Sequence, residues 1–237
     1  MNCAQDSMPM RGFLIDVWKK FSCAPLDYYV KNEGTLRLFQ LGIKFAMLQV
    51  TVEEIKETIH SRFSTLVQQN NRTFYGFLAD LEIYFYLIQS SLDMIARFTR
   101  HFYPESHWKE IKKDKKKKKE EVTNKKAKEN FAAQIAFIKR NAEKDPEYAR
   151  YLTENLKWFE KAHKHRNELA HNCALTIFFS RDNVEKRDKI YFGTKLGGAH
   201  PRPEHEEVVK VIEETYQGFN DFIEYYNSFF SNKNIVQ

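Results

Sequence analysis

The chain has 237 residues, 42% of them hydrophobic and 30% charged, which is enough to build and bury a globular core. Only 8 glycines and 6 prolines are present, which argues against a turn-rich β-sandwich and favours a helical protein. The net charge of +6 comes from one segment, residues 109–128, which holds eleven Lys and four acidic residues. The overall charge therefore does not indicate a nucleic-acid-binding surface.

The three cysteines, Cys3, Cys23 and Cys173, show no Cys-x-x-Cys spacing. The sequence therefore indicates neither a disulfide framework nor a zinc site. No apolar run near the N-terminus has the length of a signal peptide, and none elsewhere approaches the roughly 18 residues of a membrane span. We expect a cytoplasmic protein that does not enter a membrane.

The first part of the chain predicts two helices after an irregular lead-in. Residues 1–34 are mixed, with room for one short helix, and helical periodicity begins at Thr35. Thr51, with Glu54 three residues later, has the pattern of a capping box. We therefore expect a second helix to start at Thr51 and to end near Asn70.

The longest predicted helix follows, with Thr73 as its cap and its end before Pro104. Asp80 is a carboxylate within the apolar face of this helix. The Lys-rich segment at 109–128 comes next and is expected to be a solvated loop or a frayed helix, because like charges repel. An arm that attracts RNA is the alternative.

The last part of the chain predicts helices around a small hairpin. One helix is expected over 129–143, and a long one from Pro146 through "HKHRNELAHN" at 163–172. "LTIFFS" and "KIYFG" then predict two strands of a β-hairpin. A final amphipathic helix is expected over 206–230, and its aromatic residues would form a partner-binding face if exposed: Tyr216, Phe219, Phe222, Tyr225, Tyr226 and Phe229.

Polar residues of "HKHRNELAHN" fall on or beside the packing face of their helix. On a helical wheel Arg166 lies within the apolar arc, and His163, Asn167 and His171 lie at its edge. A buried guanidinium needs a carboxylate, a phosphate or another chain as its partner, and Asp80 is one candidate. The wheel places four residues on the solvated side: Lys161, Lys164, His165 and Glu168.

Two interpretations of this pattern remain open. In the first, Arg166 belongs to an internal salt bridge, and His171 is a helix C-terminal histidine that the dipole favours. In the second, the two residues form a site. No carboxylate or thiol stands at ligand spacing from the histidines on their own side of the helix, so we expect neither a metal nor a cofactor.

The segment from Arg166 to His171, "RNELAH", is similar to the R-x(4–6)-H motif of the HEPN superfamily, in which a polar residue such as Asn167 often follows the arginine. Its position late in a long helix also fits, and the resemblance covers roughly residues 74–230. It implies an all-α helical bundle of HEPN type. We expect that domain over 73–237, with the Lys-rich insert at 109–128 and the hairpin before the last helix. Residues 1–72 would be a helical extension packed on it.

The resemblance implies a metal-independent endoribonuclease that is usually a homodimer with its two motifs in one cleft. His171 would be the general acid and base, Arg166 would bind the scissile phosphate, and Asn167 would orient the site. His163 would line the groove, and Asp80 is a possible supporting residue. The chemistry is coherent, because RNA supplies its own 2′-OH nucleophile and a histidine can transfer its proton. The partners implied are RNA, a second copy of the chain and, for a toxin or defence effector, a cognate antitoxin or neighbouring protein.

Two other classes of function remain. A non-catalytic HEPN-like module for binding or dimerisation would have Arg166 paired with an internal carboxylate such as Asp80, and His171 covered. A helical scaffold without any nucleic-acid role would instead use the aromatic residues of the C-terminal helix.

Overall fold

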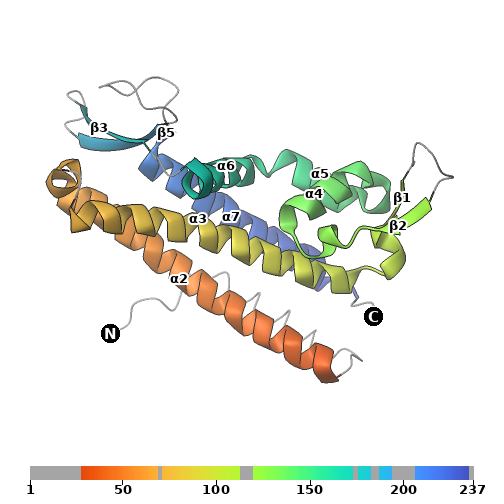
Figure 1. Cartoon of the computed structure of the whole chain (residues 1–237). Coiled ribbons are helices and arrows are strands. Elements are labelled where there is room, and N and C mark those ends of the chain that lie inside the picture. The colour runs from red at the N-terminus through yellow and green to blue at the C-terminus, as the bar shows by residue number, and fades with distance from the viewer. Residues whose placement is uncertain are drawn as a thin grey trace. The chain divides into compact units, whose positions relative to one another are not determined.

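The computed structural model describes residues 28–68, 71–112, 120–172, 176–182, 187–193 and 206–234 (Figure 1). Within these ranges, side chains are described except at 28–32, 110–112, 120–123, 170–172, 176, 178, 181–182 and 187–188. Cys3, Cys23, Cys173, His200 and His205 lie outside the described side chains.

The described chain is mostly helical. Its α-helices are α2 (Tyr28–Val67), α3 (Arg72–Thr99), α4 (Phe131–Arg140), α5 (Pro146–Glu154), α6 (Lys157–Asn172) and α7 (Val208–Ser231). Short 3-10 turns are η1 (Arg100–Phe102), η2 (Glu105–Trp108), η3 (Lys126–Lys128) and η4 (Ala142–Lys144). The strands are β1 (Lys109–Lys112), β2 (Glu120–Thr123), β3 (Thr176–Asp182), β4 (Arg187–Gly193) and β5 (Glu206–Glu207). The predicted helical class with a small sheet is confirmed at this level.

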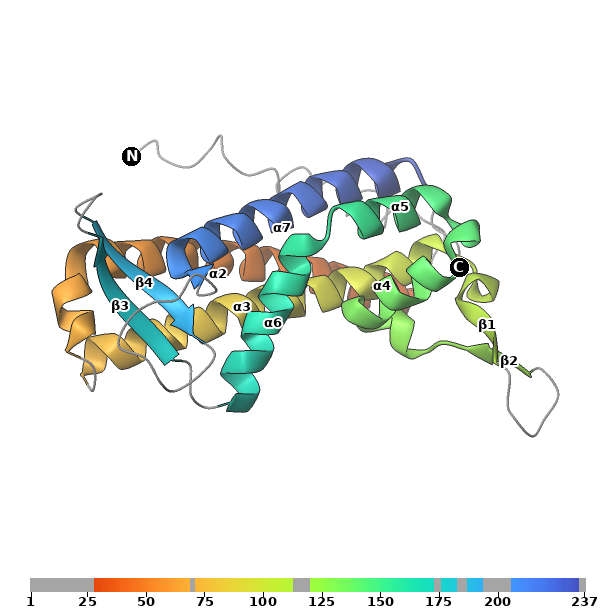
Figure 2. The same ribbon diagram turned by 90° about the horizontal axis from the view of Figure 1, so that it is seen from above.

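The predicted hairpin before the last helix is confirmed. β3 and β4 pair in antiparallel fashion, from Thr176 opposite Gly193 to Asp182 opposite Arg187 (Figure 2). The third strand was not predicted: β5 pairs with β4, so that Glu206 is a strand residue and α7 begins only at Val208. A strand as short as β5, which pairs with a partner distant in sequence, leaves no local signal. For this reason the sequence pattern predicted the start of the last helix two residues too early.

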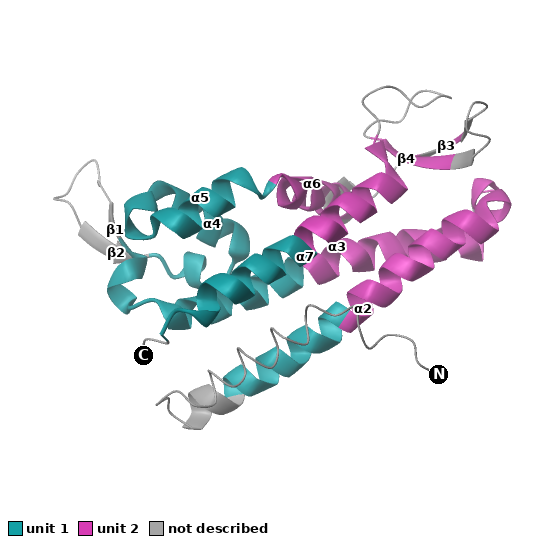
Figure 3. Ribbon diagram, turned by 180° about the vertical axis from the view of Figure 1, so that it is seen from behind, with its two compact units in different colours: residues 1–45, 89–156, 220–237 teal, residues 46–88, 157–219 magenta. Residues whose placement is uncertain are grey.

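The chain divides into two compact units, which Figure 3 shows in different colours. Unit 1 comprises residues 1–45, 89–156 and 220–237, and unit 2 comprises 46–88 and 157–219. The helices α2, α3 and α7 each contribute to both units. The domain division expected from the sequence, between residues 72 and 73, stays a prediction.

Helix α2 does not break where the sequence indicated. Thr51 is buried within the helix, and its hydroxyl donates to the Met47 carbonyl at 2.8 Å instead of capping a new helix. The helix departs from helical geometry only at Arg62. The reason is a buried stripe at spacings of three and four that continues past position 51, so the helix is not interrupted there: Leu38, Leu41, Phe45, Leu48, Val52, Ile55 and Ile59.

The cap of α3 is Asn71 and not the predicted Thr73. The Asn71 Oδ1 accepts a hydrogen bond from the Phe74 amide at 2.9 Å, which is the usual N-cap geometry. Its Nδ2 also donates to the Thr65 carbonyl at 2.6 Å. The same asparagine therefore ties the end of α2 to the start of α3.

The core of unit 1 is held by buried polar contacts as well as apolar packing. The Asp93 carboxylate accepts from the Phe131 amide at 2.8 Å, and Gln134 Nε2 donates to the Ala96 carbonyl at 3.2 Å. The hydroxyls of Thr99 and Tyr226 are 3.1 Å apart. These bonds join α4 and the C-terminal part of α7 to α3 and satisfy groups that would otherwise be buried without partners.

Asp145 anchors the start of α5, as the Asp-Pro pair predicted. Its Oδ1 accepts from the Tyr148 amide at 3.2 Å, and Pro146 occupies the first helical turn. The same carboxylate accepts from the Tyr103 hydroxyl at 2.5 Å and pairs with Lys233. One buried side chain thus holds a helix start and the C-terminal end of α7 together.

The core of unit 2 joins α2, α3, α6 and α7. The Tyr84 hydroxyl donates to the Ile212 carbonyl at 3.0 Å. On the surface, Lys56 Nζ forms a salt bridge with Glu213 Oε1 at 2.7 Å. Trp158 packs edge to face on Phe219, with ring centroids 6.1 Å apart. Aromatic burial of this kind supplies most of the stabilising area of a small core.

The aromatic stripe of α7 is internal, so it is not the partner-binding face proposed for the scaffold. Phe219, Phe222 and Tyr226 are fully buried, while Tyr216, Tyr225 and Phe229 are half-buried. Among the described residues, the large exposed apolar side chains lie instead on α2 (Leu36, Phe39, Ile43, Met47, Val50 and Val67) and on α3 (Tyr75, Ile83 and Tyr86).

The flanks of the Lys-rich segment form strands where a loop or a frayed helix was expected. β1 and β2 pair in antiparallel fashion, with Lys112 opposite Glu120 and Ile111 opposite Glu121. Residues 113–119, which hold the longest Lys run, lie outside the described residues.

No helix of the described chain is long and apolar enough to cross a membrane.

His107 in unit 1 makes stability depend on pH. Its ring is buried, stacks on Tyr103 at 4.1 Å between centroids, and lies near Lys144. Burial first, and the positive charge of Lys144 second, lower its pKa from 6.5 to about 4. The unfolded chain therefore takes up the proton first as the pH falls through 6.5, and the folded state loses stability down to about pH 4.

We expect His107→Phe to reduce the stability lost between pH 7 and pH 5 by roughly 2 kcal/mol. The phenyl ring keeps the stacking on Tyr103 and cannot be protonated. Urea denaturation of both proteins at the two pH values measures the difference. An equal loss in the variant and the wild type would show that His107 does not titrate on unfolding.

Candidate functional site on helix α6

The motif helix is shorter than the sequence indicated. The single helix expected from Pro146 breaks in two, with α5 ending at Glu154 and α6 beginning at Lys157. The Asn155 amide still donates to the Tyr151 carbonyl at 3.0 Å, and Leu156 is buried between the two helices. The predicted apolar face of the motif helix therefore included residues of α5 and of the break, which do not share the helix axis of α6.

The buried face of α6 is displaced from the predicted one. Trp158, Phe159 and Ala162 are buried as expected, but His165, which was placed on the solvated side, is only 1% exposed. The prediction for His165 was wrong for two reasons. Leu156 was used to locate the apolar face, but it precedes α6 and is not part of that helix. In addition, the β3–β4 hairpin covers the side of α6 that was expected to face solvent.

His165 is enclosed by aromatic rings. Its imidazole stacks on Phe192 of β4, with centroids 4.4 Å apart, and lies 5.8 Å from the ring of Phe85 on α3. Its Nε2 lies 3.1 Å from Glu206 Oε2, and its Nδ1 lies 3.3 Å from Glu168 Oε2 without hydrogen-bond geometry. His165 thus fastens α6 to the hairpin, the added strand β5 and α3.

Burial and the nearby carboxylates have opposite effects on the pKa of His165. Burial lowers the pKa of His165, while the carboxylates of Glu206 and Glu168 raise it, and the net direction is downward. Burial raises the pKa of Glu206, but Lys161, His165 and Lys164 more than reverse this. Lys161 lies 3.1 Å from Glu206 and 2.5 Å from Glu214. No spacing in the sequence connects Glu206 with the motif, so this network could not be predicted.

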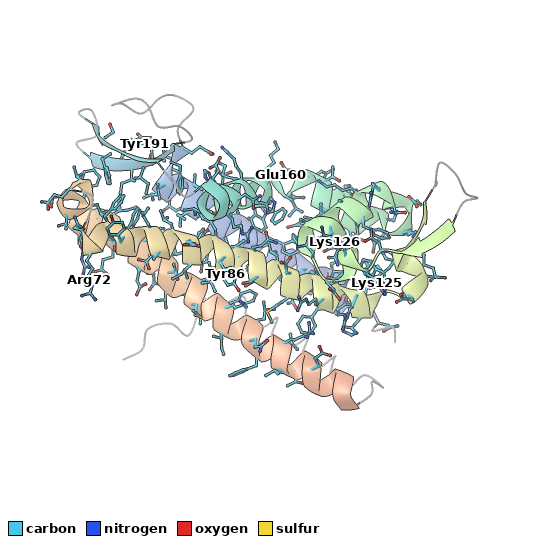
Figure 4. The ribbon with its side chains drawn as sticks, in the orientation of Figure 1. Arg72, Tyr86, Lys125, Lys126, Glu160 and Tyr191 are labelled. Carbon is cyan, nitrogen blue, oxygen red and sulfur yellow. The ribbon has the colours of Figure 1, made fainter. Side chains whose placement is uncertain are left out.

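Arg166 and Asn167 lie at the half-exposed edge of α6, and the side chains of this helix are drawn in Figure 4. Arg166 was expected within the apolar arc, whereas its side chain is partly open to solvent. The Arg166 Nη1 donates to Asn167 Oδ1 at 3.1 Å. Within the described part of the chain, no carboxylate pairs with this guanidinium. His163 is half-buried, and its ring stacks on Phe159 at 5.7 Å.

His171 lies in the last turn of α6, and its side chain lies outside the described residues. The helical backbone alone sets its direction relative to the other motif residues. Asn167 and His171 are four residues apart and share a side of the helix, together with His163 one turn earlier. Arg166 is five residues from His171, which places the two about 140° apart around the helix axis.

Asp80 is not the partner of Arg166. Both side chains are described, and no salt bridge joins them. Asp80 is half-buried on α3, where burial first and the nearby Glu54 carboxylate second raise its pKa. The internal ion pair that the non-catalytic alternative required is therefore not formed by these two residues.

The chemistry that this edge of α6 offers is that of a guanidinium, an amide and a histidine. Among the described residues, no three His, Cys, Asp or Glu side chains converge in an arrangement that could hold a metal ion. A guanidinium beside an amide oxygen keeps most of its donors free, and such donors match the oxygens of a phosphate group.

Comparisons with family models, curated proteins and solved structures find no match to this chain.

Proposed function

We propose that the protein is a metal-independent endoribonuclease of HEPN type, with Arg166, Asn167 and His171 as its site residues. The state of Arg166 is the main support. The residue is half-buried, and its hydrogen bond within the described chain goes to the neighbouring Asn167. An arginine that forms no ion pair with described carboxylates, on a helix otherwise tied down by Lys161 and His165, has its donors available for a phosphate.

The proposed reaction uses the nucleophile of the substrate. The 2′-OH attacks the adjacent phosphorus as a base removes its proton, and the P–O5′ bond breaks as the leaving oxygen gains a proton. The products are a 2′,3′-cyclic phosphate and a 5′-OH end. His171 would transfer the protons, and Arg166 would stabilise charge on the phosphate oxygens. Asn167 would hold the guanidinium, and His163 would line the groove.

The geometry of the helix supports a composite site made by two copies of the chain. Arg166 and His171 are five residues apart, so their positions lie about 140° apart around the helix axis, and one short substrate segment does not easily meet both from a single helix. In a homodimer with two facing α6 helices, the arginine of one copy and the histidine of the other would approach one phosphate. A toxin or defence role, with an antitoxin or a neighbouring protein covering this groove, would follow from the same activity.

The test is cleavage of total cellular RNA in the presence of EDTA, with analysis of the product ends. We expect cleavage by the wild type that leaves 2′,3′-cyclic phosphates and 5′-OH ends. Ends carrying 5′-phosphate, or a strict requirement for a divalent metal, would contradict the proposal. No cleavage by folded, dimeric protein would favour a non-catalytic module.

A module for self-association is the second candidate, and the exposed face of α2 favours it. The exposed residues between positions 35 and 50 carry no charge: Thr35, Leu36, Phe39, Gln40, Ile43, Ala46, Met47 and Val50. A solvated helix face normally carries charged residues, whereas apolar residues at spacings of three and four suit a second copy of the same helix. Light scattering of the wild type and Phe39→Glu measures the oligomeric state, and an unchanged mass would remove α2 as the interface.

A further inference from the structure

A small basic cavity lies in unit 1, separate from the motif of α6. Its volume is about 30 Å³. It lies where the N-terminal part of α2 meets the end of α3 and the turn η1. The lining residues are Glu33, Gly34, Arg37, Arg97, Phe98, Arg100 and His101.

The positive charges of this cavity exceed the negative ones. Of the described residues, three arginines and a single carboxylate, that of Glu33, line it. Glu33 already pairs with Arg37, one helical turn away. The charge of Arg100 also acts on Glu33, but one carboxylate balances only one of the three arginine charges.

Among the described residues, neither Arg97 nor Arg100 forms a salt bridge, and Arg100 feels the Glu33 carboxylate only at longer range. The Arg97 Nε is buried and has no hydrogen-bond partner. The Arg100 Nε donates to His101 Nε2 at 3.4 Å, a long bond to a group without negative charge. Both side chains are half-buried, and a guanidinium that is partly removed from water without a salt bridge favours an anion beside it.

His101 is a neutral hydrogen-bonding group here. Burial first, and the charges of Arg100 and Arg37 next, lower its pKa to about 4. Because its Nε2 accepts from Arg100, the proton of the neutral ring resides on Nδ1. The helix end does not supply the missing negative charge, since a helix C-terminus carries only about half an elementary charge.

We propose that this cavity binds a single phosphate group through Arg97, Arg100 and Arg37. The tetrahedral oxyanion matches planar guanidinium donors arriving from different elements. A cavity of about 30 Å³ is too small for a nucleoside. The site is independent of the proposed ribonuclease activity, because it uses none of the residues of α6. The phosphate is either the free ion or the terminal group of a larger molecule.

Thermal unfolding tests the proposal. The wild-type Tm is measured with inorganic phosphate, with AMP and with adenosine, each against sodium chloride of equal ionic strength. We expect a saturable rise of roughly 5–10 °C at a hundredfold excess over the dissociation constant, with phosphate, AMP or both, and none with adenosine. A response to AMP alone identifies a terminal phosphate as the ligand. No rise with either phosphate compound overturns the proposal.

Matched arginine variants assign the effect to the cavity. Arg97→Gln and Arg100→Gln are expected to abolish the rise in Tm, and Arg150→Gln, at an exposed position of α5, is expected to retain it. Loss of the rise in all three variants would show a general charge effect and overturn the site. Because Arg97 forms no salt bridge among the described residues, the Tm of Arg97→Gln without ligand should change little.

A second measurement uses the wild type only. Phosphate bound beside His101 adds negative charge next to the ring, so it should raise the pKa of His101 from about 4. NMR titration of the histidine ring protons with and without phosphate measures this shift. An unchanged His101 titration at saturating phosphate contradicts binding in the cavity.

Discussion

Arg166→Gln is expected to reduce RNA cleavage at least about 100-fold, because one well-placed donor to a developing phosphate charge contributes on the order of that factor. The variant should fold normally. Arg166 is half-exposed, and its hydrogen bond within the described chain is to the adjacent Asn167 at 3.1 Å, so no other described element depends on it. Cleavage rates in EDTA and thermal unfolding of the same samples measure both quantities.

Two further variants test whether a specific site at Arg166, and not the net charge, controls cleavage. Lys157→Gln removes an exposed positive charge from the first turn of the same helix and should leave cleavage unchanged. Arg166→Lys keeps the charge but loses the planar fork, so its rate should fall between those of the wild type and Arg166→Gln. A similar loss in Lys157→Gln and Arg166→Gln would mean that net charge, and not a site at Arg166, controls the activity.

His171→Ala should abolish cleavage as well, since general acid–base catalysis contributes about 100- to 10,000-fold. The fold and the dimer are expected to persist. An unfolded His171→Ala protein would show that this histidine is structural and would leave Arg166→Gln as the test of the site.

Gly218→Ala should destabilise unit 2 more than any other single methyl group added to a helix there. A Cβ at this position would lie 2.2 Å from Trp158 Cγ and 2.7 Å from Trp158 Cβ. These atoms are close to the backbone of α6 and cannot swing away, so α6 and α7 must move apart. Overpacking of this kind costs about 3 kcal/mol.

Gly76→Ala on α3 is the matched control. Nothing lies within 4 Å of the Cβ that it would add, and the position is exposed. Alanine should therefore stabilise this helix by about 0.5–1 kcal/mol, because it restricts the unfolded chain and suits a helix better. Urea denaturation of both variants gives the two free energies. Equal and small effects would show that Trp158 does not pack against Gly218.

The two sets of variants separate activity from folding. Trp158 and Gly218 hold α6 against α7, so Gly218→Ala should also lower cleavage by disturbing the helix that bears the motif. Arg166→Gln should lower cleavage without lowering the free energy of unfolding. A loss of activity that always follows a loss of stability would argue that α6 has only a structural role.

The helices and the hairpin were predictable because their signals are local. The buried stripe of α2, the Asp-Pro start of α5 and the alternating runs of β3 and β4 each follow from the period of one element. Capping was harder to predict. Thr51 and Thr73 both have the residue type of a cap, but Thr51 bonds within its helix to Met47, and Asn71 caps α3 in place of Thr73.

The candidate site was only partly predictable. The residues of the motif and their order along one helix follow from the sequence, as does the half-exposed edge that Asn167 and His163 share. The break at Asn155 and the strand β5 do not, because they depend on contacts between residues far apart in the chain. His165 shows the result: Phe192 and Glu206 enclose a side chain that the local pattern placed in solvent.

By itself the sequence determined a helical protein with a late hairpin, and it placed an arginine, an asparagine and a histidine within six residues of one helix. These properties depend on spacing along the chain, because the period of a helix or a strand determines which residues lie on the same face. Only the tertiary structure decided which of those faces is buried, that Asp80 lies beside Glu54 and not with Arg166, and that three arginines of α2, α3 and η1 line one cavity. Burial and charge pairing depend on which elements meet in space, and no local spacing encodes that choice.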